Sequence, residues 1–166
     1  EIVGQVLLMN KLLEEENEKV THIVVMGTGE PFDNYENVLD FVRIMNHPKG
    51  LEIGARHITV STSGIVPKIK EFADFPLQIN LAISLHAATN PLRSKIMRIN
   101  KAYPIEELMD AIRYYLDKTN RRVTFEYILI KGVNDSYQDA MDLIKLVRGV
   151  NCYINLIPYN EVETNP

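Results

Sequence analysis

Cysteine and long apolar runs are nearly absent from this sequence of 166 residues, which contains a single cysteine, Cys152. One cysteine cannot form an internal disulfide, and alone it cannot hold a zinc ion or an iron–sulfur cluster. No apolar run reaches the roughly 18 residues that a membrane-spanning helix needs. The chain also does not open on a basic segment followed by an apolar one, as a secretory signal does. We therefore expect a soluble, cytoplasmic protein with no membrane contact, in which any metal would need other ligands.

The overall composition is that of a globular protein. Hydrophobic residues make up 46% of the chain and charged residues 24%. These values exclude a disordered or collagen-like chain and suit a fold with a sizeable core. With no linker, repeat or low-complexity tract in the sequence, we predict a single domain over residues 1–166.

Charge is distributed unevenly along the chain. Residues 1–18 contain five acids and one base, which accounts for the whole formal net charge of −4. Residues 93–101 (RSKIMRINK) contain four bases and no acid, namely Arg93, Lys95, Arg98 and Lys101. A local basic run can contact RNA phosphates even on an acidic protein, although surface Lys and Arg are common and such runs are often only solvated.

Apolar periodicity alternates between helix and strand along the chain. We predict strands at 21–26, 57–63, 77–86, 122–130 and 152–160, and helices at 2–13, 37–46, 66–72, 105–118 and 136–148. Strands that alternate with helices indicate an α/β fold with a parallel sheet and right-handed crossovers. Both an open doubly wound sheet and a barrel satisfy this order.

Polar residues gather where the predicted strands end, and ligands of parallel α/β folds bind at the carboxyl ends of strands. These residues are Gly27-Thr28-Gly29-Glu30, Ser61-Thr62-Ser63, Ser84-Leu85-His86, Lys131 and Tyr159-Asn160. Because all five strand ends contribute, we favour a barrel.

Each of these features also has an ordinary structural interpretation. The GTGEP segment can be a simple turn, and the serines and threonine at 61–63 can cap the following helix. We expect these three residues both to cap and to bind. A lone histidine such as His86 is often a hydrogen-bonded structural residue. We interpret Cys152 as a small buried hydrophobe.

Five ordered motifs together resemble one enzyme family. They are VVMGTGEP (24–31), STSGIVP (61–67), LAISLHA (81–87), VTFEYILIKGVND (123–135) and CYINLIPYN (152–160). In this order they resemble the RlmN/Cfr family of radical S-adenosylmethionine (SAM) adenosine methyltransferases, over nearly the whole chain. The resemblance implies a partial (β/α)6 radical SAM barrel, with parallel strands two to six present and the first strand and cluster loop missing.

The resemblance also implies a cofactor site. Gly29 and Glu30 would hold the methionyl amino end of SAM, and Ser61, Ser84, Leu85, His86 and Asn160 would complete its cradle, with His86 in the wall and without acid–base work. The family's [4Fe-4S] cluster cysteines and its methyl-carrying cysteine have no counterpart in this sequence. We therefore expect the chain to be an excised fragment that itself holds no iron and transfers no methyl group.

By the same resemblance, the full-length enzyme would methylate carbon 2 of an adenosine in 23S rRNA, and possibly in tRNA. It would use a 5′-deoxyadenosyl radical and a methylated cysteine outside this chain. The alternatives are methylation at carbon 8 of adenine, as in Cfr, and a noncatalytic SAM- or nucleotide-binding α/β module. A dinucleotide enzyme is a weak alternative because GTGEP lacks the third glycine of GxGxxG. The apolar strand at 21–26, left at a sheet edge, could favour self-association.

Overall fold

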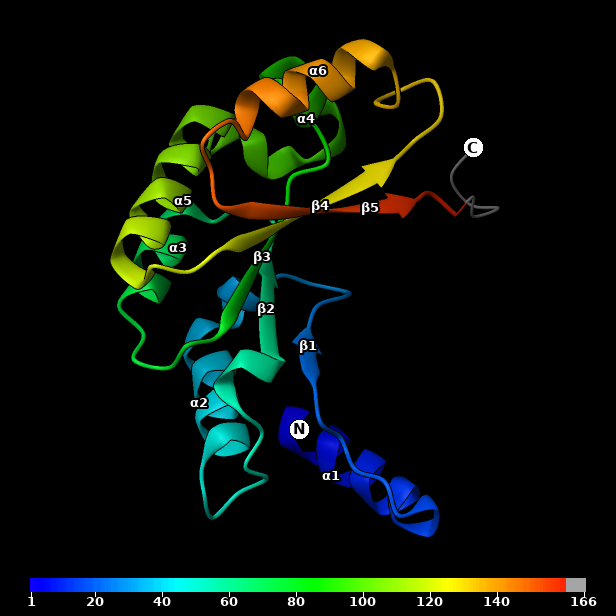
Figure 1. Ribbon diagram of the computed structural model, residues 1–166, viewed down its shortest axis with the longest axis vertical. Coiled ribbons are helices and arrows are strands. Elements are labelled where there is room, and N and C mark those ends of the chain that lie inside the picture. Colours follow the sequence, from blue (N-terminus) through cyan, green and yellow to red (C-terminus); the bar gives the residue numbers. More distant parts are fainter. Residues whose placement is uncertain (161–166) are drawn as a thin grey trace. The chain divides into compact units, whose positions relative to one another are not determined.

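The computed structural model describes residues 1–160, and these form an α/β fold (Figure 1). The helices are α1 (Ile2–Leu13), α2 (Tyr35–Asn46), α3 (Val66–Ala73), α4 (Asn90–Ile96), α5 (Ile105–Thr119) and α6 (Tyr137–Leu146). The strands are β1 (Ile23–Val25), β2 (Ile58–Thr62), β3 (Asn80–Ser84), β4 (Val123–Leu129) and β5 (Cys152–Pro158). All five predicted strands and all five predicted helices are confirmed, whereas α4 was not predicted.

The five strands form one parallel sheet in the order β1-β2-β3-β4-β5. A doubly wound sheet reverses its strand order at a switch point, whereas a barrel adds each strand next to the preceding one. The uninterrupted order therefore supports the barrel-type interpretation of the sequence. As predicted, β1 lies at an edge of this sheet, and the self-association expected from it stays a prediction.

The chain divides into two compact units, and the division falls within β2 and β3. Unit 1 comprises residues 1–61 and 76–81, and unit 2 comprises 62–75 and 82–166. The single domain predicted over residues 1–166 stays a prediction.

In unit 1, β1 pairs with β2 so that Ile23 lies opposite Ile58 and Val25 opposite Val60. Helix α2 buries one face, formed by Tyr35, Val38, Leu39, Phe41, Val42 and Met45. This spacing of three and four residues is that of an amphipathic helix. Helix α1 buries none of its residues.

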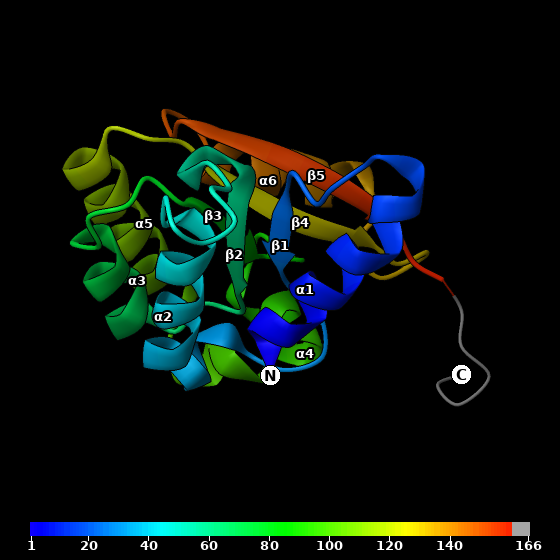
Figure 2. The same ribbon diagram turned by 90° about the horizontal axis from the view of Figure 1, so that it is seen from below.

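In unit 2, α3 and α5 lie side by side in both views (Figures 1 and 2). The rings of Phe72 on α3 and Tyr115 on α5 stack with centroids 6.3 Å apart. Helix α6 and the strands β4 and β5 line one cavity, with Leu143 from α6, Tyr127 from β4 and Leu156 from β5. The side chains of Val123, Phe125 and Tyr127 on β4 are buried. This packing leaves the loops at the carboxyl ends of the strands to carry polar groups.

Within residues 1–160, no helix is both long enough and apolar enough to cross a membrane.

Candidate functional site

The turn after β1 is shaped by two glycines. Gly27 has φ +129° and Gly29 has φ +107°, in the region that favours glycine. A Cβ added at either position would meet no other atom within 4 Å. The backbone angle, and not crowding within the protein, therefore explains the glycines of this segment.

Glu30 follows these glycines and caps the 3₁₀ helix at Pro31–Asn34. Its Oε1 accepts a hydrogen bond from the backbone N–H of Phe32 at 2.9 Å. Phe32 is buried and packs edge-on against Tyr35, which anchors the turn to α2. The carboxylate is thus held in place by local folding.

The turn after β2 differs from the sequence-based expectation. Helix α3 has Ile65 at its N-cap position and no side-chain cap, so the predicted capping by residues 61–63 is wrong. Instead, Thr62 Oγ1 accepts from Gly64 N at 3.1 Å, which forms a tight turn before the helix begins. Ser61 is a buried residue of β2, and it is the last residue before the chain passes from unit 1 to unit 2.

The segment Ser84-Leu85-His86 begins at the last residue of β3, and backbone hydrogen bonds tie it to β4. Leu85 N and His86 N both donate to Glu126 O, at 3.0 and 3.2 Å. His86 has φ +58°, a left-handed conformation that costs a non-glycine residue free energy. The surrounding contacts must therefore hold this loop in place.

The His86 imidazole is held as a neutral ring. Its Nδ1 accepts from Ile128 N at 3.1 Å, which places the ring proton on Nε2. Burial, and then the charge of Arg93, lower the pKa of His86 to about 4. At neutral pH the residue therefore presents an uncharged Nε2–H donor.

Asn134 connects the same loop to the end of β4, and its side chain is almost fully buried. Its Nδ2 donates to His86 O at 2.8 Å and to Ile128 O at 2.7 Å, and its Oδ1 accepts from Ile130 N at 2.7 Å. The hydroxyl of Tyr127 donates to the Asn134 carbonyl at 3.1 Å. One amide side chain thus satisfies three backbone groups.

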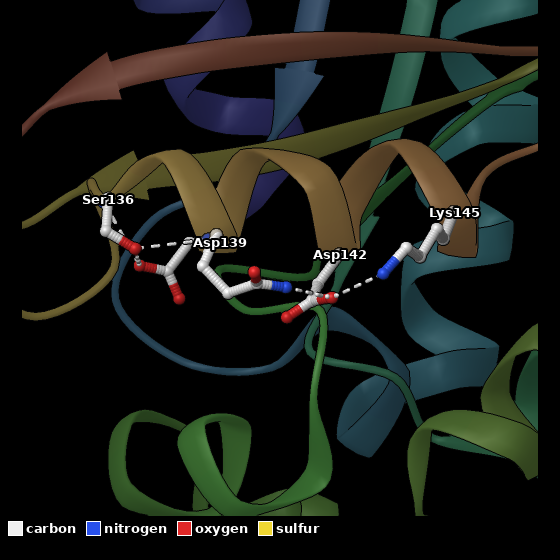
Figure 3. A network of polar contacts seen from close by, with 5 residues as sticks. Ser136, Asp139, Asp142 and Lys145 are labelled. Atoms are coloured by element: carbon white, nitrogen blue, oxygen red, sulfur yellow. Dashed lines mark hydrogen bonds and ion pairs between the residues drawn. The ribbon is translucent and has the colours of Figure 1, made fainter.

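Helix α6 begins directly after this corner, with a capping box of Ser136 and Asp139 (Figure 3). Farther along the helix, Asp142 accepts from Gln138 at 2.9 Å and pairs with Lys145 at 3.5 Å. The cap at Ser136, two residues after Asn134, fixes where α6 starts.

Arg93 lies on α4 and is completely buried. Its Nη2 donates to Ser63 O and Ser84 O, its Nε donates to Leu85 O, and its Nη1 donates to Asn100 Oδ1. The expectation that Arg93 contacts RNA phosphates from the surface is therefore wrong, because its donors point into the protein. Lys95, Arg98 and Lys101 are exposed, and their RNA contact stays a prediction.

Two further residues that hold the Ser84-Leu85-His86 segment, Asn134 and Glu126, were not singled out for this role by sequence reasoning. Glu126 is buried in β4, and its Oε2 accepts from Asn155 Nδ2 at 2.7 Å. An acid inside an otherwise apolar strand is the signal that could have identified it, because carboxylates are rarely buried unless they are paired.

The structure brings some of the predicted site residues together. Ser84, Leu85 and His86 share one loop of unit 2, and Asn160 is exposed after β5 in the same unit. Gly29, Glu30 and Ser61 belong to unit 1. The union of both groups in one cofactor site stays a prediction.

The described residues contain no group of three or more His, Cys, Asp or Glu side chains that could hold a metal ion. Cys152 is half-buried at the start of β5, and burial raises the pKa of its thiol. A protonated thiol is a poor nucleophile and a poor metal ligand.

Comparison with known proteins gives a consistent family. Residues 5–144 match the radical SAM superfamily. The chain is 64% identical over 165 residues to a protein of Spiroplasma citri described as a probable dual-specificity RNA methyltransferase RlmN, covering 99% of this chain and 48% of that protein. A protein of Geobacillus kaustophilus with the same description is 63% identical, covering 98% of this chain and 44% of its own length.

A solved structure is also similar. The crystal structure of a radical SAM methyltransferase from Sphaerobacter thermophilus has a TM-score of 0.96 and 49% identity to this chain, covering 99% of the chain and 48% of that protein. The chain therefore spans about half the length of the relatives that it matches.

Proposed function

Because the chain belongs to the radical SAM superfamily, we propose that it forms the SAM-binding core of an RNA methyltransferase that acts on carbon 2 of an adenosine in 23S rRNA. The observation that carries this proposal is the close structural similarity, at a TM-score of 0.96, to a radical SAM methyltransferase. The description of two relatives as probable dual-specificity RNA methyltransferases supports RNA as the substrate. We propose tRNA as a second substrate.

The residues at the strand ends fit SAM. Its ammonium needs an acid, which Glu30 supplies in unit 1 beside glycines that carry no side chain. Its hydroxyls and adenine edge need small donors and acceptors, which Ser61, Ser84 and the Nε2–H of His86 supply. Since His86 is neutral at pH 7, it donates without repelling the positively charged sulfonium.

When bound, SAM together with a reduced [4Fe-4S] cluster supplies the radical chemistry that an unactivated adenine carbon requires. No set of cluster ligands is present among the described residues, so this chain's own share is to bind and orient the cofactor and to exclude water from it. The target adenine would leave its RNA stack to reach the strand ends, and the exposed Lys95, Arg98 and Lys101 would contact nearby phosphates.

The test uses a polypeptide extended at both ends to the length of the relatives, reconstituted without oxygen with iron and sulfide. After incubation with SAM, a reductant and 23S rRNA, the digested nucleosides are analysed by mass spectrometry. Methylation at carbon 2 supports the proposal, and methylation at carbon 8 supports the Cfr-type alternative. A protein that binds SAM and produces neither nucleoside would be a binding module.

Glu30→Gln serves as a matched variant in the same assay. It keeps the shape and the acceptor for Phe32 N and removes the charge. A charge-assisted hydrogen bond is worth about 1.5 to 3 kcal/mol, so SAM affinity should fall about tenfold or more. Unchanged SAM affinity would mean that this turn does not bind the cofactor.

A further inference from the structure

Arg93 is a buried cation to which the structure gives only uncharged acceptors. They are the carbonyls of Ser63, Ser84 and Leu85, at 2.7, 3.2 and 3.2 Å, and the side chain of Asn100 at 3.1 Å. Burial lowers the pKa of Arg93 to about 10, which still leaves the guanidinium protonated at neutral pH. Burying a charge without a carboxylate partner is costly, so its hydrogen bonds must provide a compensating advantage.

That advantage is geometric. A guanidinium holds five N–H donors in one rigid plane, whereas a lysine ammonium is a single point on a flexible stem. Through this plane Arg93 fixes the backbone after β2 and the backbone after β3 at the same time. The fit is close, because a Cβ added at Gly64 would lie 3.3 Å from Arg93 Nη2 and 3.2 Å from Leu108 Cδ1.

The loop that Arg93 holds is the one proposed to line the cofactor. Glu126 and Asn134 hold the opposite side of the loop. The carbonyl of Glu126 accepts from the N–H groups of Leu85 and His86, and the side chain of Asn134 donates to the carbonyl of His86. The positive φ of His86 is sustained between these two sets of contacts. Removing either set would release the loop while the strands themselves remain paired.

We propose that Arg93 is a positioning residue for cofactor binding, which clamps the carbonyls of Ser63, Ser84 and Leu85 so that the Ser84-Leu85-His86 loop presents its donors to SAM. This inference rests on the proposed function. The positive charge of Arg93 also disfavours protonation of His86, which keeps that ring an uncharged donor. In this proposal Arg93 acts on the cofactor through the loop and not by direct contact.

The test compares Arg93→Lys with Arg113→Lys in the reconstituted full-length enzyme. Arg113 is an exposed residue on α5 that pairs with Asp110, so its substitution controls for the loss of a guanidinium as such. The SAM dissociation constant is measured by equilibrium dialysis. We expect it to rise about tenfold or more for Arg93→Lys, which keeps the charge but loses the planar fork, and to stay unchanged for Arg113→Lys.

Hydrogen exchange followed by mass spectrometry separates positioning from general destabilisation. In Arg93→Lys, peptides covering residues 84–86 and 126–130 should exchange at least about tenfold faster, while a peptide from the middle of α5 keeps the wild-type rate. Equal acceleration in α5 would reveal a merely structural role and overturn the proposal. Wild-type affinity for SAM in Arg93→Lys would overturn it as well.

Two measurements do not depend on the folding of Arg93→Lys. SAM added to the wild-type enzyme should slow exchange at residues 84–86, and no slowing would show that this loop is not part of the site. Asn100→Ala removes one acceptor of Arg93 and leaves its three carbonyl bonds, so SAM affinity should fall about threefold, and no fall would count against the clamp. A wild-type enzyme that does not bind SAM would overturn the proposed function as well, whereas tight binding that is indifferent to Arg93 would overturn only this inference.

Discussion

Replacing Asn134 with Ala should destabilise the protein more than any exposed amide substitution in unit 2. The Asn134 side chain makes three hydrogen bonds, to His86 O, Ile128 O and Ile130 N, with lengths of 2.7 to 2.8 Å. Alanine removes all three and leaves these backbone groups without the partner that the side chain supplied. The bond from the Tyr127 hydroxyl to the backbone carbonyl of residue 134 is kept.

The magnitude follows from the number of bonds. A typical intramolecular hydrogen bond contributes about 1 kcal/mol net, and a buried group left without a partner costs about 1 to 3 kcal/mol. Water can reach part of this corner, because His86 and Ile130 are only partly buried. We therefore expect a loss of about 2 to 4 kcal/mol, a large fraction of the roughly 5 to 15 kcal/mol by which domains are stable.

The assay is urea denaturation followed by circular dichroism, with Gln138→Ala as the matched control. Gln138 is exposed on α6, and its amide makes one hydrogen bond, to Asp142. Its loss should change the free energy of unfolding by less than about 0.5 kcal/mol. Equal midpoints and equal slopes for the two variants would refute the argument that the Asn134 network stabilises the loop after β3.

Three further outcomes are expected. Gly29→Ala should destabilise the protein by about 1 to 2 kcal/mol through its positive φ alone. Gly4→Ala within α1 should stabilise the protein by up to about 1 kcal/mol. Shifts of the melting temperature in the same direction for both variants would contradict this. Because the pKa of His86 is lowered from 6.5 to about 4, the unfolded state binds the extra proton between these values. The stability from this group is therefore intact above pH 6.5 and lost as pH falls toward 4, and His86→Gln should lose less stability than wild type across that window. Arg98→Ala combined with Lys101→Ala should reduce the slope of log RNA affinity against log salt by about 1.4, at roughly 0.7 per single-strand phosphate contact, and an unchanged slope would show only a solvated surface.

The alternation of strands and helices could be predicted because it depends on local apolar periodicity. The predicted strand at 77–86 is shorter in the structure, where β3 ends at Ser84, because the last predicted residues turn into the loop. Helix α4 was missed because it has only seven residues. A run so short gives too few apolar positions to establish a helical period.

The ends of the strands could be located from the sequence, but the contacts among the residues there could not. Parallel strands bring their carboxyl ends to one edge, so Ser84 and His86 were expected there. The bond from Ile128 N to His86 Nδ1 joins residues 42 positions apart, and that from Asn134 to His86 O spans 48. No local pattern encodes which of many polar groups meets which across such a distance. Side-chain orientation is decided by the packed structure.

Arg93 shows why a count of charges is a poor guide to the surface. The basic run predicted an exposed residue because arginine is rarely buried, yet buried backbone carbonyls also need donors. Where a parallel strand ends, its last carbonyls can leave the sheet ladder, and Arg93 donates to those of Ser84 and Leu85. The carbonyl of Leu85 also accepts from the backbone N–H of Ala87 at 2.8 Å. Arginine can satisfy several such carbonyls at once, which lysine cannot do in the same geometry. A single arginine shortly after a strand of an α/β fold is therefore a candidate for the interior of the loop that follows, and in this protein that loop is the one proposed to hold the cofactor.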